Sequence, residues 1–233
     1  MRYTRCQKMK ALRVEFCAQT ASFRHWDGHL LQRTYLFPPK TTVVGMLGAA
    51  MGLELREVWE LLENIKVGMV LKRIGGFGRD LWKILKLKSG QIQRAVVLRE
   101  FLFDVRYTLY LVDTDELLER LETALNMPRY PLTLGNSNDL VTFLKAETVN
   151  LYEMPVEVVE STVLKGDLRS LLKPLQKHCE IFVDTLPTRN VFNKMGGRVG
   201  TEHTKPFTCL FGRFEFQAPK KLWVYGGDAF ELL

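Results

Sequence analysis

Apolar and polar residues alternate along parts of the chain in a way that predicts strands, and elsewhere they follow helical spacing. Ala11 to Ala18 alternates as a half-buried strand does, while Thr42 to Met51 is a helical stretch without charge. In LELREVWELLENI, residues 53–65, apolar residues recur every three or four positions, which predicts a second helix. Leucines from Leu117 to Leu125 form the stripe of a third helix that Pro128 ends. Further strands are predicted at 67–74, 95–101, 107–112, 147–153, 152–163, 209–216 and 222–226.

The order of these elements predicts an α+β fold. Strand, helix, strand, strand, helix and strand follow one another, which is the β-α-β-β-α-β order of a ferredoxin-like, or RRM-like, core. A basic β-hairpin is inserted at about residues 75–93, and additional β-strands follow the core. We therefore expect a ferredoxin-like domain at residues 1–155 and a mostly β extension at 156–233 that packs on it.

Composition narrows the class of protein. Of the 233 residues, 46% are hydrophobic, as in an ordinary globular protein. The formal net charge of +7 favours a polyanionic partner. The longest uncharged stretch, Thr41 to Leu53, is too short to span a bilayer, and no apolar signal core follows the basic N-terminus. The four cysteines are scattered, so we expect reduced thiols, a cytoplasmic location and no membrane partner.

A basic segment between Lys72 and Arg99 contains a single acid, Asp80. Cations neutralise phosphates and flat rings stack on unpaired bases, so this composition favours contact with single-stranded RNA. The alternative is a solvated hairpin whose charged edge prevents aggregation. The candidate RNA-binding residues of this segment are Arg73, Arg79, Trp82, Lys83, Lys86 and Lys88.

A second candidate site surrounds TYLFPPKTTVVGMLGAAMG, residues 34–52. Thr41 or Thr42 is in position to cap the helix that begins here, and Lys40 with the free N–H groups of the first turn forms a plausible anion site. The alternative is a buried helix packed on a sheet. The loop before this block adds charged, aromatic and hydroxyl side chains, and the candidates of the whole region are Arg24, His25, Arg33, Tyr35, Lys40, Thr41 and Thr42.

The loop TLGNSND, residues 133–139, is a third candidate. Gly135 and Asn136 tolerate positive φ, so successive N–H groups here, with Ser137 beside them, can point together at a phosphate. An ordinary turn after the preceding helix explains the same residues. In a ferredoxin-like fold this loop and the Arg24–Lys40 loop lie at the ends of neighbouring elements, so we expect them to form one cleft.

Catalytic and metal sites have little support in the sequence. His25 and His29 lie four residues apart, but Gly28 and the loop context argue against a helix that would present both rings to one metal. A metal-independent ribonuclease needs a base and cations near the 2′-hydroxyl, which His25, Tyr35 and Lys40 supply in one region. We expect neither a metal nor a cofactor.

Three stretches in order resemble the Cas-five family of CRISPR-associated proteins, which belong to the RAMP superfamily of ferredoxin-like RNA-binding proteins. The first is ALRVEFCAQTASFR followed by the aromatic-Pro-Pro block and its Gly/Ala-rich helix, residues 11–52. The others are REFLFDVRYTLYLV, residues 99–112, and YPLTLGNSNDLV, residues 130–141. The resemblance covers roughly residues 10–155, and the remainder matches less distinctly.

This resemblance implies a noncatalytic subunit of a type I CRISPR surveillance complex, Cascade, which serves antiviral defence. Such a subunit holds the five-prime handle of the guide RNA (crRNA), ends the row of backbone subunits, contacts the large subunit and meets target DNA only indirectly. One branch of the family cleaves precursor RNA with an adjacent Lys-His pair in mid-chain. Here the one Lys-His dipeptide is Lys177–His178, which disfavours cleavage. Two alternatives stay open, namely a metal-independent endoribonuclease and a general ferredoxin-like RNA-binding module.

Overall fold

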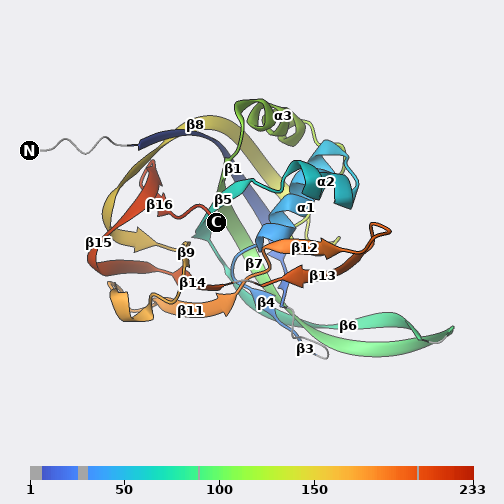
Figure 1. Cartoon of the computed structure of the whole chain (residues 1–233). Helices are drawn as coiled ribbons and strands as arrows, with labels where there is room; N and C mark the ends of the chain where they lie inside the picture. The colour runs from blue at the N-terminus through green and yellow to red at the C-terminus, as the bar shows by residue number, and fades with distance from the viewer. Residues whose placement is uncertain (1–6, 26–30, 89, 204) are drawn as a thin grey trace, which may run out of the picture.

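A computed structural model describes residues 7–25, 31–88, 90–203 and 205–233, except for the side chains of residues 86 and 88. Its centre is a large antiparallel sheet in which four long strands lie in the order β8–β1–β7–β5 (Figure 1). These strands are β8 (Val141–Glu160), β1 (Gln7–Ala21), β7 (Gln91–Val112) and β5 (Lys66–Arg73). The mixture of a large sheet with helices confirms the predicted α+β class.

Three helices cover one face of this sheet: α1 (Lys40–Met51), α2 (Leu55–Leu61) and α3 (Asp115–Asn126) (Figure 1). Alternate residues of β1, from Leu12 to Ala18, pack beneath them in the main core. The helix predicted from Thr42 begins two residues earlier, and its N-cap is Pro39, without a capping side chain. The expectation that Thr41 or Thr42 caps α1 is therefore wrong, because the fixed φ of Pro39 already suits a helix start.

The C-terminal third adds strands to both sides of the fold. β10 (Leu172–Pro174), β15 (Arg213–Tyr225) and β16 (Asp228–Phe230) extend the large sheet from β8, and β9 (Val163–Lys165), β11 (Glu180–Thr185) and β14 (Pro206–Phe211) form a sheet of three. A one-turn 3-10 helix, η1 (Arg169–Leu171), precedes β10. The strand predicted at 209–216 is broken at Gly212, where φ is +96°. Residues 155 and 156 lie inside β8, so the division of the chain at that point stays a prediction.

Short paired strands lie at the end of the fold that contains the N-terminus of α1. β2 (Phe23–Arg24) pairs with β4 (Thr34–Tyr35), and β3 (Leu31–Gln32) pairs with β7. β12 (Arg189–Phe192) and β13 (Arg198–Glu202) form a two-stranded sheet of their own, which crosses in front of α1 in Figure 1. The sequence KMGGRVG, residues 194–200, forms the tip of this hairpin and the start of β13.

The inserted basic hairpin is longer than predicted. β6 (Gly76–Lys88) pairs with residues 91–103 of β7 in continuous register, and the pair projects away from the body (Figure 1). Its outer part buries little, because Leu81, Leu85 and Leu87 are 70–77% exposed. Within the described residues, no helix is both long enough and apolar enough to cross a membrane.

Candidate nucleic-acid interface

Four segments far apart in the sequence surround a cleft of about 570 Å³ at the N-terminus of α1. Two of them are the loops that the sequence predicts to meet, namely the loop after β1 and the loop at 133–139. The β12–β13 hairpin closes the cleft from another direction. The lining residues are Ser22, Phe23, Arg24, His25, Pro39, Thr41, Thr42, Gly135, Asn136, Pro187, Arg198, Val199, Gly200 and Thr201.

Buried polar contacts fix the 133–139 loop against the end of β1. The Asp139 carboxylate is fully buried and accepts hydrogen bonds from Thr20 Oγ1 at 2.6 Å and from Ser22 Oγ at 2.5 Å. Asn136 Nδ2 donates to the same Ser22 Oγ at 2.6 Å, and the Ser22 N–H donates to Leu134 O at 3.0 Å. The loop is therefore anchored before any ligand arrives.

Gly135 is required by the protein itself at this point. Its φ is +107°, and a Cβ added to it would lie 1.8 Å from the carbonyl oxygen of Ser22. The sequence suggested Gly135 as part of a phosphate-binding turn, whereas the close approach that the structure contains is that of the Ser22 carbonyl. Ser137, in the same loop, is exposed but does not line the cleft.

His25 and Tyr35 are packed parts of the cleft wall, not exposed loop residues. His25 is 5% exposed, its Nε2 lies 2.8 Å from Asp184 Oδ2, and its ring lies 4.4 Å from that of Tyr35. Tyr35 is 4% exposed and its hydroxyl donates to the carbonyl of Thr185 at 3.2 Å. His25 still lines the cleft, although most of its side chain is buried, and the buried Tyr35 ring is not available to stack on a base.

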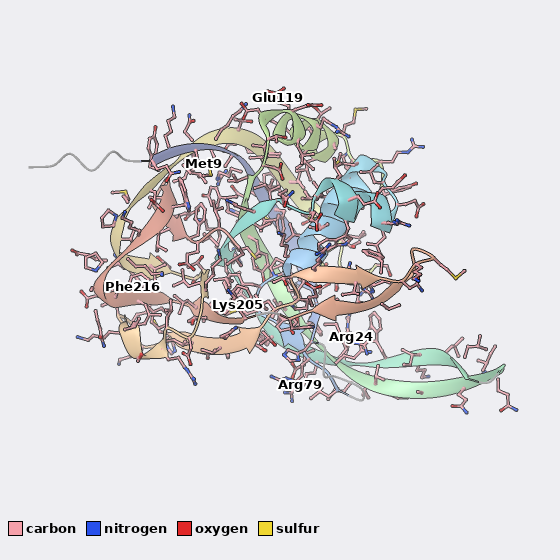
Figure 2. All side chains as sticks on the ribbon, viewed as in Figure 1. Met9, Arg24, Arg79, Glu119, Lys205 and Phe216 are labelled. Atoms are coloured by element: carbon pink, nitrogen blue, oxygen red, sulfur yellow. The ribbon has the colours of Figure 1, made fainter. Side chains whose placement is uncertain are left out.

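Two arginines supply the positive charge of the cleft. Arg24 and Arg198 are both exposed and both line it, and Figure 2 labels Arg24 beside β13. Lys40, expected to share this task, is half-buried and is not among the lining residues. Burial lowers the pKa of Lys40, while the charges of Asp113 and Lys165 act on it in opposite directions. Arg33 is exposed on the β3–β4 connection and also lies outside the lining.

The predicted residues of the long hairpin lie apart from this cleft. Figure 2 labels Arg79 at the base of the β6–β7 hairpin, where its guanidinium pairs with Glu100 at 2.9 Å. Arg73 pairs with Asp104 at 2.6 Å, and Lys83 is exposed. Lys86 and Lys88 are strand residues whose side chains lie outside the described set.

Trp82 is held within the hairpin and does not stand out as a free stacking platform. Its indole N–H donates to Asp80 Oδ2 at 2.9 Å, and the guanidinium carbon of Arg99 lies 3.9 Å from its ring centroid. Arg99 is 4% exposed and donates two hydrogen bonds to Asp80, at 3.1 and 2.9 Å. This guanidinium holds the pKa of Asp80 below its ordinary value. One face of the indole is therefore covered.

The chemistry of the cleft suits a phosphate chain. The described residues that line it include no carboxylate side chain. They include two arginines and three threonines, and the N-terminus of α1 lies among them. The first N–H groups of an α-helix lack intrahelical acceptors, and the helix dipole favours an anion there. Among the described residues no group of three or more His, Cys, Asp or Glu side chains is placed to hold a metal ion; His29 lies outside those residues.

Sequence reasoning missed the contribution of the β12–β13 hairpin. Pro187, Arg198 and Thr201 reach the cleft from a region of the chain far beyond Arg24. The signal that was present is the basic, glycine-rich KMGGRVG segment, because such a composition on a surface hairpin is typical of phosphate contact. The sequence around this segment does not show which distant residues it meets in the fold.

Among the comparisons with known proteins, the match to a family model identifies the family of this chain. A family model described as "CRISPR-associated protein (Cas_Cas5)" matches residues 11–190. A comparison with curated proteins finds no match. A solved structure titled "CRISPR RNA-guided surveillance complex" is similar with a TM-score of 0.53 at 13% identity, over 90% of this chain and 91% of that one. A CRISPR protein from Archaeoglobus fulgidus aligns over 95% of this chain and 98% of its own, at 12% identity with a TM-score of 0.47. At these identities the structural similarity bears on the fold alone.

Proposed function

The chain belongs to the CRISPR-associated protein (Cas_Cas5) family, and on that premise we propose that it is a noncatalytic subunit of an RNA-guided surveillance complex of the Cascade type. In this proposal it holds the five-prime handle of the guide RNA in the cleft at the N-terminus of α1. We also interpret the strand order β8–β1–β7–β5, with α1 and α3, as the ferredoxin-like arrangement of RNA-binding proteins.

One observation carries the proposal, namely the convergence of four segments on a cleft whose described lining residues include two arginines and no carboxylate. Guide RNA is held by shape and by phosphate contact, because its bases must stay available for pairing with the target. Arg24 and Arg198 supply planar forks that match phosphate oxygens. Thr41, Thr42 and the first turn of α1 supply neutral donors, and the anchored 133–139 loop keeps the wall in place.

The long β6–β7 hairpin serves assembly in this proposal. Its outer leucines are largely exposed on a projecting arm, and an exposed apolar surface of this kind marks a contact with another macromolecule. The neighbouring backbone subunit of the complex is the proposed contact, and the cations interleaved with the leucines keep the free hairpin soluble. The large subunit and, through it, the target DNA are further proposed partners.

Crosslinking tests the assignment of the cleft. Handle RNA that carries 4-thiouridine is bound to the full-length protein, irradiated, and the crosslinked peptides are identified by mass spectrometry. We expect crosslinks at residues 22–25, at 39–42 and at 198–201. Crosslinks confined to the β6–β7 hairpin or to the strands after residue 205 would place the RNA elsewhere and overturn the proposal.

A second candidate, metal-independent cleavage of precursor RNA, is favoured by the His25–Asp184 contact in the cleft wall. A carboxylate that holds one ring nitrogen orients an imidazole for general base catalysis. Against it, the Tyr35 hydroxyl is engaged by a backbone carbonyl, and Lys177 and His178 do not line the cleft.

Incubation of repeat RNA with the purified protein in EDTA separates the two candidates. We expect intact RNA. A product with a 2′,3′-cyclic phosphate that disappears in both His25→Ala and Asp184→Asn, while RNA binding persists, would establish the ribonuclease instead.

A further inference from the structure

A second polar pocket, of about 430 Å³, lies between α2 and the β12–β13 hairpin. It shares the hairpin with the RNA cleft, but its lining residues are different. They are Arg56, Trp59, Glu60, Glu63, Arg189, Asn190, Val191, Phe192, Asn193 and Glu202. Since the family model ends at residue 190, most of the hairpin side of this pocket lies beyond the matched stretch.

Two buried polar atoms of this pocket have no hydrogen-bond partner in the part of the chain that the structure describes. One is the indole N–H of Trp59, a residue that is 6% exposed. The other is the side-chain oxygen of Asn190, a residue that is 5% exposed. Folded proteins pair nearly all buried polar groups, because an unpaired one loses its bonds to water without replacement. One unpaired donor and one unpaired acceptor in the same pocket are therefore a sign of a missing partner.

The charges around the pocket disfavour a phosphate chain. Arg56 pairs with Glu60 at 2.9 Å, and Arg189 pairs with Glu63 at 2.7 Å, which joins the hairpin to the turn after α2. Glu202 has no ion-pair partner among the described residues. Three glutamates and two arginines leave a net charge of −1 on the lining, so the pocket repels phosphate and attracts a cation.

We propose that this pocket binds an amide of a protein chain, a glutamine or asparagine side chain followed by a basic residue. This proposal rests on the proposed function, since the neighbouring subunits of a complex supply such a chain. A carboxamide carries both a carbonyl that can accept from the Trp59 N–H and an N–H that can donate to the Asn190 oxygen. The basic residue that follows pairs with Glu202.

The β12–β13 hairpin is built to admit such a group. The two unpaired atoms are covered in the free chain, so the ligand enters as the hairpin moves slightly from α2. This two-stranded sheet pairs with no other described strand, and an isolated hairpin of two strands depends on its packing for stability. Breaking the Arg189–Glu63 ion pair at the surface costs little, because water solvates both charges.

The test uses the full-length, ¹⁵N-labelled protein and two capped dipeptides, N-acetyl-Gln-Lys-amide and N-acetyl-Gln-Glu-amide. The indole N–H signal of Trp59 is identified among those of the four tryptophans from a Trp59→Phe variant. We expect the lysine dipeptide to shift this signal saturably, and the glutamate dipeptide to bind about fivefold more weakly or worse. Asn190→Leu should weaken the lysine dipeptide about tenfold, which corresponds to the loss of about one hydrogen bond.

Glu202→Gln provides the matched control, because it is an exposed substitution that leaves the fold intact even where Asn190→Leu does not. It should abolish the preference for the lysine dipeptide. No saturable shift, equal binding of both dipeptides, or a shift caused by a single-stranded RNA oligonucleotide instead would each overturn the proposal. Handle-RNA affinity of both variants should equal that of the wild type. If the wild type binds no RNA, the proposed function fails, whereas the dipeptide result still decides this site.

Discussion

Replacing Arg198 by alanine is the sharpest test of the RNA cleft, because the sequence alone does not single this residue out. Arg198 is exposed at the start of β13 and lines the cleft with Arg24. A hydrogen bond to a charged group contributes about 1.5–3 kcal/mol, and competition by water at an exposed site favours the lower end. We therefore expect Arg198→Ala to weaken handle-RNA binding by about tenfold at low salt.

The salt dependence distinguishes a phosphate contact from a general loss of structure. For single-stranded nucleic acid, the log–log slope of affinity against salt changes by about 0.7 for each phosphate contact. Fluorescence anisotropy with labelled handle RNA, measured at several salt concentrations, should give a slope smaller by about 0.7 for Arg198→Ala. Arg198→Lys should keep the slope and lose part of the affinity, since lysine keeps the charge without the planar fork.

Arg169→Ala is the matched control. Arg169 is also an exposed arginine, but it pairs with Asp167 and lies outside the cleft lining. It should change neither the affinity nor the slope, and all three variants should unfold within about 1–2 °C of the wild type. An unchanged slope in Arg198→Ala, or an equal change in Arg169→Ala, would refute the assignment of this hairpin to the RNA site.

Three further predictions follow from the geometry. Gly135→Ala should destabilise the protein by about 2 kcal/mol or more, through its positive φ and the contact with Ser22, whereas Gly200→Ala, in the same cleft but with open space around it, should not; thermal unfolding of both checks this. Replacing Leu81, Leu85 and Leu87 by serine should leave the melting temperature unchanged, because they are already exposed, but should reduce co-purification with the neighbouring backbone subunit; a large stability loss would show a packed hairpin instead. Because Arg99 lowers the pKa of Asp80, this pair stabilises the fold above the unfolded pKa of Asp80 and loses that contribution as pH falls through its folded pKa. The stability difference between the wild type and Asp80→Asn, expected below about 1 kcal/mol for this partly exposed carboxylate, should narrow in urea titrations as the pH falls below about 4, the ordinary pKa of an aspartate.

Local sequence patterns determined the elements and the class of the fold. The alternation in residues 11–18, the leucine stripe at 117–125 and the uncharged stretch after Pro39 are properties of short segments, so they predicted β1, α3 and α1. The approach of the loop after β1 to the 133–139 loop was also foreseeable, because the order of the predicted elements constrains which ends are neighbours. Charge composition likewise indicated the basic hairpin.

Tertiary structure alone decided which of the candidate side chains face the cleft. Lys40, Tyr35 and Arg24 are close in sequence, yet their surroundings differ. Lys40 is half-buried away from the cleft and Tyr35 packs against His25, whereas Arg24 is exposed on the lining. These differences depend on Asp113, Asp184 and Thr185, which reach this region from distant strands and loops. Arg198 joins the site for the same reason, since the packing of a hairpin against α1 is a long-range contact that no local pattern encodes.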